Sequence, residues 1–257
     1  MESQSEVKAS FRLMLVASLL TLALWFIPFA GVITWPIVQF ATLVHETGHA
    51  LAALATSGMV RRVTLDWNGN GATLSAGGWT LVVASAGYLA TMLYGSGLLL
   101  ALRRARNARI AAAVTAALFL FITVFFGGNL LAWLVGLFFG VGGLLLAWKA
   151  KPKVAHFVMS FLAVQCVLNA LYDLRVLLFL SASDSGVHTD AQVMAAATNG
   201  FIPAIVWALG WSVLAVAMLG ATLMIYYRSL RRRAEMAEPM MPYLLPDHAS
   251  DMAQPHL

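Results

Sequence analysis

Charged residues and cysteine are both scarce in this chain. Only 11% of its 257 residues are charged, 61% are hydrophobic, and the mean hydropathy is +0.81. So little charge excludes an ordinary soluble domain and is typical of a protein with several membrane spans. The single cysteine, Cys166, excludes an intrachain disulfide and a zinc site built from several cysteines. The net charge of +5 comes from short Arg and Lys clusters, which indicate topology signals and headgroup contacts rather than a nucleic-acid surface.

Long apolar runs predict an all-α polytopic membrane protein with about seven transmembrane helices. We divide the chain into an N-terminal tail (1–12), a membrane-embedded domain (13–227) and a flexible C-terminal tail (228–257). The predicted spans cover about residues 13–33, 36–57, 80–102, 110–126, 130–148, 154–180 and 202–227.

The segment between the second and third spans breaks this pattern and predicts a small β-hairpin near residues 60–78. Apolar Val63, Leu65 and Trp67 alternate with polar residues, and an Asn/Gly turn at 68–71 separates them from a second short run. The strands are too short to cross a bilayer, and an isolated hairpin is marginal, so we expect it to pack on the helices. An ordinary interfacial loop is the alternative.

The predicted second span carries polar residues with metal-ligand spacing. His45 and His49 are four residues apart, so they share a helix face and can point at one metal ion. Glu46 lies beside them, where its carboxylate could act as general base on a water held by the metal. Neutral imidazole is a good zinc ligand, and ionisable groups at membrane depth tend to be functional. The pattern favours a zinc centre over a chance match whose polar residues are satisfied by neighbours.

The predicted sixth span carries the second polar cluster. Gln165, Asn169 and Asp173 are each four residues apart and therefore lie along one helix face. Catalytic zinc commonly has three protein ligands and leaves one position for water. Outside the loops and tails, Glu46 and Asp173 are the only acidic residues, so Asp173 is the predicted third ligand. The alternative is a pairing of Asp173 with Arg175 near the helix end, or with another basic residue.

Three features together resemble the site-2 protease family of intramembrane zinc metallopeptidases, most closely its compact bacterial peptidase M50B-like branch. They are the run His45–Ala50, the hairpin-like insert and the late run Asn169–Asp173, and the resemblance covers about residues 37–180. The better-known members separate the Asn and Asp further, with a proline between them and a glycine after the Asp. Here the spacing is four, and Leu174 follows the Asp.

The resemblance implies a role for each matched residue. His45, His49 and Asp173 would bind Zn²⁺, and Glu46 would be the catalytic glutamate. Asn169 would hold the substrate or the developing oxyanion, and the hairpin would contact an unwound substrate segment.

The implied activity is hydrolysis of peptide bonds in transmembrane substrates by a metalloendopeptidase of the bacterial cell membrane. Because water must reach the site, we expect a polar channel lined by the hairpin, Asn169 and Gln165, and Gln165 is a predicted substrate contact. The expected partners are a transmembrane protein substrate and the lipid bilayer, with no nucleic acid, and the sequence indicates no oligomeric state. Two alternatives stay open: a membrane protein that binds or transports a divalent metal without proteolysis, and an inactive protease-like scaffold.

The basic clusters predict an orientation in the membrane. With seven spans, the clusters at 103–109, 149–153 and 228–233 fall on one side, and fewer basic residues fall on the other. The larger set predicts a cytoplasmic C-terminus, an external N-terminus and an external hairpin. The resemblance implies the opposite, because well-studied members have their active site near the cytosolic leaflet.

Overall fold

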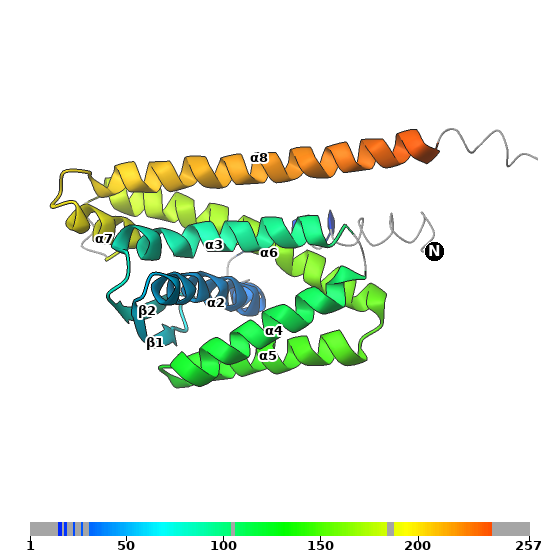
Figure 1. Cartoon of the computed structure of the whole chain (residues 1–257), viewed down its shortest axis with the longest axis horizontal. Helices are drawn as coiled ribbons and strands as arrows, with labels where there is room; N and C mark the ends of the chain where they lie inside the picture. The colour runs from blue at the N-terminus through cyan, green and yellow to red at the C-terminus, as the bar shows by residue number, and fades with distance from the viewer. Residues whose placement is uncertain are drawn as a thin grey trace, which may run out of the picture.

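Long helices make up most of the chain (Figure 1). The computed structural model describes residues 31–103, 106–183 and 188–237, with isolated positions between 15 and 27. Its elements are α2 (Gly31–Ala55), β1 (Met59–Leu65), β2 (Gly71–Ala76), α3 (Thr80–Ala101), α4 (Asn107–Phe126), α5 (Leu130–Lys149), α6 (Pro152–Ala182), α7 (Asp190–Ala197) and α8 (Ala204–Ala237).

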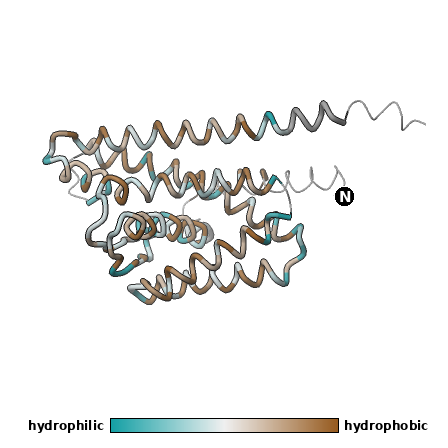
Figure 2. Tube along the Cα trace, viewed as in Figure 1, coloured by the Kyte–Doolittle hydropathy of each residue, from teal (hydrophilic) through white to brown (hydrophobic). Residues whose placement is uncertain are grey.

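Five of the described helices are long and apolar enough to cross a membrane: α3, α4, α5, α6 and residues 204–229 of α8. Figure 2 shows apolar residues along the whole length of these helices and polar residues mainly at the connections. This pattern matches helices whose backbone polar groups are satisfied internally while their side chains face lipid. The predicted first span lies mostly outside the described residues, and α2 is not among the five.

Close helix contacts place α2 against α3. Gly48 of α2 faces α3 so closely that a Cβ there would lie 2.6 Å from the Ala90 Cβ and 2.8 Å from the Ala86 carbonyl oxygen. Small residues at such a crossing let two backbones approach each other within a membrane. In turn α3 packs on α6 and α8, and α4 and α5 form an antiparallel pair beside them (Figure 1).

Two large apolar clusters flank the α2–α3 crossing. One joins α3, α6, α7 and α8 through residues such as Met92, Leu174 and Trp211. The other joins α2, β1, α4, α5 and α6 around Phe40, whose ring contacts Phe119 and Phe139 edge-on. The crossing is therefore fixed from both sides, and so are the residues that α2 carries.

The predicted hairpin is present, as an antiparallel pair in which Val63 faces Thr73 and Leu65 faces Gly71. The α4–α5 connection covers the outer edge of β1. The Gly128 amide donates to the Val63 carbonyl at 2.8 Å, and the Asn129 side chain donates to the Leu65 carbonyl at 2.7 Å. The hairpin thus leans on the helices, as a two-stranded unit must.

Three elements differ from the boundaries predicted from sequence. The described part of α2 extends back to Gly31 and includes Pro36 inside the helix, at the cost of one intrahelical hydrogen bond. The polar stretch 181–200, which lies between the predicted spans 154–180 and 202–227, contains α7. Helix α8 runs through the arginines to Ala237, within the predicted flexible tail, because arginine ends a membrane span without opposing helix formation.

Candidate metal centre

The two histidines of α2 point at the same place. Their Nε2 atoms are 3.0 Å apart, and their rings lie at 70° to each other. The Nδ1 atom of His49 lies 2.7 Å from the Val83 carbonyl oxygen of α3. Because a carbonyl can only accept a hydrogen bond, Nδ1 carries a proton, and this contact sets the ring orientation and aims Nε2 at the site. Metal-binding histidines typically have such a partner on their second nitrogen.

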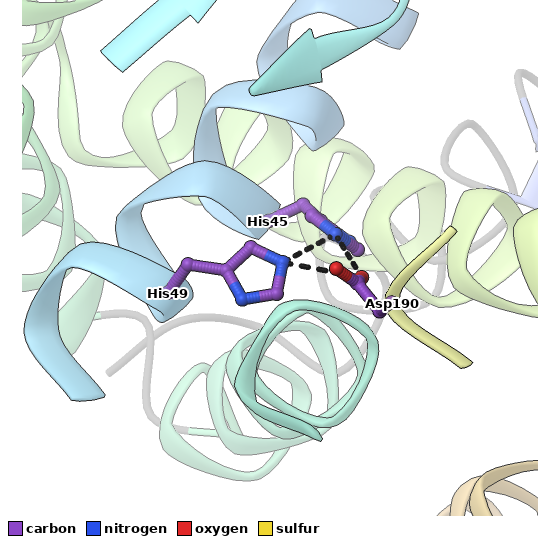
Figure 3. Close-up of side chains that lie close together, drawn as sticks. All are labelled: His45, His49 and Asp190. Carbon is purple, nitrogen blue, oxygen red and sulfur yellow. Dashed lines mark hydrogen bonds and ion pairs between the residues drawn. The ribbon is translucent and has the colours of Figure 1, made fainter. Parts of the chain in front are cut away.

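The third group at this point is Asp190, the first residue of α7 (Figure 3). Its Oδ2 atom lies 3.4 Å from Nε2 of His45 and 3.3 Å from Nε2 of His49. Thr189 and Gln192 form a reciprocal capping box that fixes the start of α7. Burial by itself would raise the pKa of Asp190, but its contacts with the two histidines hold that pKa below its usual range. The carboxyl is therefore ionised.

These three ligand atoms fit a small divalent cation. Tetrahedral zinc with bonds of 2.0–2.2 Å separates its ligand atoms by about 3.3–3.6 Å. The observed separations of 3.0, 3.4 and 3.3 Å come close to that spacing. Two imidazoles and one carboxylate are also a donor set that zinc takes in catalytic sites, with a further position left for water.

Gly87 of α3 provides the room at this point. A Cβ on Gly87 would lie 2.2 Å from Nε2 of His45 and 2.4 Å from Nε2 of His49. Any side chain there would occupy the space that the ligand atoms face. The sequence pattern indicates Gly87 only as part of a close-packing stripe, whereas the structure adds this second role.

The acid next to the histidines is held by the hairpin. Glu46 is only 4% exposed, and the Thr73 hydroxyl of β2 donates to its Oε2 atom at 2.6 Å. The other carboxylate oxygen lies over Gly71, where a Cβ would be 2.8 Å from Oε1. The Glu46 carboxylate therefore lies against the backbone of β2.

Three further residues on one face of α2 contact the hairpin turn. The Trp35 indole donates to the Trp67 carbonyl at 2.9 Å, and its ring stacks on the Trp67 ring. Gln39 donates to the carbonyl oxygen of residue 66 at 2.7 Å, and Thr42 donates to that of residue 69 at 2.7 Å. These α2 positions recur every three or four residues and lead to Glu46, so they share its helix face.

An aromatic pair supports His45 from the other side. The Tyr88 ring of α3 meets the His45 ring edge-on with centroids 4.6 Å apart, and it stacks on Trp211 of α8. The Trp211 indole donates to the Ser85 hydroxyl at 3.0 Å. The orientation of His45 is thus set by α3 and α8 as well as by its own helix.

Among the residues predicted from sequence, His45, His49 and Glu46 come together, but Asp173 is not part of the ligand group. In the described part of the chain, that group consists of His45, His49 and Asp190, whose ligand atoms lie within 4.8 Å of one another. Asp173 is close enough to His45 for their charges to interact. The described residues contain no ion pair between Asp173 and Arg175 either.

The two amides of α6 are buried. The Asn169 amide nitrogen donates to the Gln165 backbone carbonyl at 3.0 Å, one turn earlier in the same helix. The Gln165 side chain is fully buried, and neither of its polar atoms has a hydrogen-bond partner in the described structure. The predicted oxyanion contact of Asn169 and substrate contact of Gln165 stay predictions.

Sequence reasoning missed Asp190 because it confined the search for a third ligand to the long apolar spans. One local signal was available. Thr189 followed by Gln192 has the T-x-x-Q spacing of a capping box, which predicts that a helix starts at Asp190. An acidic residue at the first position of a helix that follows the sixth span is therefore a second candidate for the third metal ligand.

The fold and the site together define an integral membrane protein with a candidate centre for one metal ion and a buried acid beside it. A family model described as Peptidase M50B-like matches residues 14–222, and the chain belongs to this family. The resemblance drawn from the sequence motifs is thereby confirmed. No curated protein and no solved structure matches the chain. A peptidase family, membrane helices and a possible metal site agree on a membrane metalloprotease as the general class.

Proposed function

We propose that this protein is an intramembrane zinc metalloendopeptidase that hydrolyses peptide bonds in transmembrane substrates. His45, His49 and Asp190 would hold the zinc ion, and Glu46 would be the general base. The observation that carries the proposal is the convergence of two Nε2 atoms and one carboxylate oxygen, with a buried acid on the next residue of the same helix.

The chemistry divides between the metal and the chain. A zinc ion held by His45, His49 and Asp190 would supply Lewis acidity for a carbonyl oxygen and for a water molecule. Glu46 accepts the proton of the attacking water on Oε1, because Oε2 already accepts the Thr73 hydrogen bond, and then delivers that proton to the leaving amine. Burial of Glu46 keeps bulk water from competing for this proton.

The substrate has a natural docking place beside Glu46. The described part of the chain pairs β2 with β1 alone, whereas β1 also pairs with the α4–α5 connection. The outer edge of β2 therefore offers backbone donors and acceptors to an extended segment. We propose that an unwound substrate segment lies along this edge, next to the carboxylate that Thr73 and Gly71 contact.

The proposal extends to the membrane architecture. The five apolar helices are joined by α2 and by the predicted span at 13–33 to give seven spans, in a multi-pass protein of the bacterial cell membrane. In this arrangement the polar face of α2 is turned toward the hairpin and α3 rather than toward lipid, as the cost of exposing such groups to hydrocarbon requires.

The test is proteolysis by purified protein in liposomes, with a single-span reporter helix that contains an Asn-Gly pair to ease unwinding. Wild type should cut the reporter, and Glu46→Gln should retain zinc while its rate falls by at least about 100-fold, as for loss of a general base. Asp66→Asn, the same acid-to-amide change at an exposed hairpin position, is the control and should cut normally.

Other outcomes favour the alternative functions. Full activity of Glu46→Gln would contradict the assignment of the base. Zinc uptake into the liposomes that survives Glu46→Gln, without cleavage, would favour a metal-binding or metal-transporting protein. A wild type that neither holds zinc nor cuts any reporter would favour an inactive protease-like scaffold.

A further inference from the structure

The basic residues of the helix connections gather at one end of the bundle. The end of α3, the start of α4, the end of α5 and the start of α6 meet there, and Arg109 of α4 donates to the Ala150 carbonyl after α5 (Figure 1). Seven described basic residues lie at or near this end: Arg103, Arg106, Arg109, Lys149, Lys151, Lys153 and Arg228.

The opposite end carries the hairpin, the α4–α5 connection and α7 (Figure 1). Its described basic residues are only Arg61 and Arg62 of β1, with Arg175 in the last third of α6. Lysine and arginine are enriched in the cytoplasmic connections of membrane proteins, and the larger set determines orientation. This rule assigns the basic end to the cytoplasm and the hairpin end to the other side.

This assignment does not depend on the number of spans before α2. Four consecutive connections alternate between the two ends, because α3, α4, α5, α6 and α8 each cross from one end to the other. Within the described residues from 31 onward, the strongly basic connections fall at one end and the hairpin falls at the other.

The candidate metal centre lies in the half of the bundle that is nearer the hairpin. Gly87, which faces both histidines, is seven residues after the start of α3. At 1.5 Å per residue this is about 10 Å from the end of a helix about 33 Å long. Asp190 comes from α7, which lies at the hairpin end itself.

From these observations we infer that the site works in the leaflet opposite the cytoplasm. Its substrates are membrane helices that unwind in that outer leaflet, and cleavage leaves most of the helix attached to the cytoplasmic part. This inference rests on the proposed function for its substrate, but its orientation rests only on charge and geometry. It decides between the two orientations expected from sequence in favour of the charge pattern.

Cysteine labelling of the full chain in intact bacterial cells tests the orientation. Wild type is the negative control and should not be labelled, because its only cysteine, Cys166, is fully buried. Asn70→Cys in the hairpin turn and Lys151→Cys before α6 are a matched pair of exposed positions at the two ends. A membrane-impermeant maleimide should label Asn70→Cys in intact cells and Lys151→Cys only after permeabilisation. Any other pattern overturns the inference.

Two reporter helices test the depth of cleavage. One carries its Asn-Gly pair in the outer third of the span and the other in the inner third, and the cut bonds are mapped by mass spectrometry. The reporter with the outer Asn-Gly pair should be cut, and the reporter with the inner pair should not. Preferred cutting of the inner reporter overturns the inference. If neither is cut, the proposed function fails, while the labelling pattern still decides the orientation.

Discussion

At the scale of single residues, Gly87 determines how much space the ligand atoms share. Of the three glycines in α3, it is the one at which a Cβ would meet both histidine nitrogens. A glycine-to-alanine change in a helix otherwise favours the helix by about 0.5–1 kcal/mol. Loss of metal on substitution would therefore reflect the filled space and not a weaker helix.

We predict that Gly87→Ala reduces bound zinc by at least about 10-fold, because the added methyl group occupies the metal position. Gly97→Ala, in the same helix with nothing within 4 Å of the new Cβ, is the matched control and should retain zinc. The measurement is zinc per chain in purified protein, with circular dichroism to show that both variants fold. Equal zinc in the two variants would show that Gly87 has only a packing role.

Thr73 is a positioning residue for Glu46. We predict that Thr73→Val lowers kcat of reporter cleavage by about 10- to 100-fold with little change in KM, because the carboxylate loses the donor that orients it. Thr73→Ser keeps the hydroxyl and should restore most of the rate. Zinc content should be unchanged in both, so a Thr73→Val variant that loses zinc, or one with wild-type kcat, contradicts this role.

The sequence predicts the site residues that lie close together along the chain and misses those that lie far apart. His45, Glu46 and His49 lie within one helical turn, so the helix period alone brings them together. Asp190 is more than 140 residues further along, and its place depends on how α6, α7 and α8 pack. No period relates such positions. The Thr73 contact with Glu46 likewise depends on how the hairpin packs on α2.

At the scale of elements, the hairpin is held between α2 and the α4–α5 connection. Asn129 joins these parts, because its side chain caps α5 by accepting from the Ala132 amide at 3.0 Å and also bonds both backbone groups of Leu65. The position of β2 against Glu46 therefore depends on a residue at the start of a different helix.

We predict that Asn129→Ala lowers the Tm and increases hydrogen exchange of the hairpin amides, because it removes a cap worth about 0.5–2 kcal/mol together with the bonds to Leu65. Asn129→Ser retains a capping oxygen but is too short to reach Leu65. It should recover part of the Tm and leave hairpin exchange high. Normal hairpin exchange in both variants would mean that α2 alone holds the hairpin.

Elements with a strong local pattern agree with the sequence prediction. The apolar runs give α3, α4, α5 and α6 within a few residues, and alternation with an Asn/Gly turn gives the hairpin. The sequence prediction starts the second span at Pro36 and ends the last span before Arg228, so both are shorter than α2 and α8. Helix α7 was missed because eight residues in a polar stretch carry little periodic signal.

At the scale of the whole molecule, the bundle places a polar site where lipid would otherwise surround it. The hairpin and α3 pack against α2, and α7 brings Asp190 to the two histidines, while the apolar faces of the outer helices remain for the bilayer. Membership in the Peptidase M50B-like family agrees with a membrane protease. The proposed orientation and the proposed third ligand go beyond that general class.

The most direct measurement of the central claim is zinc per chain in purified wild type beside Asp190→Ala, Asp173→Ala and His45→Ala. Wild type should hold about one zinc ion. Asp173→Ala should keep it, and Asp190→Ala should lose it as His45→Ala does, because among the described acidic residues only Asp190 has a ligand atom grouped with the two imidazoles. Zinc retained by Asp190→Ala and lost by Asp173→Ala would instead make Asp173 the third ligand, and a wild type without zinc would contradict the metal centre itself.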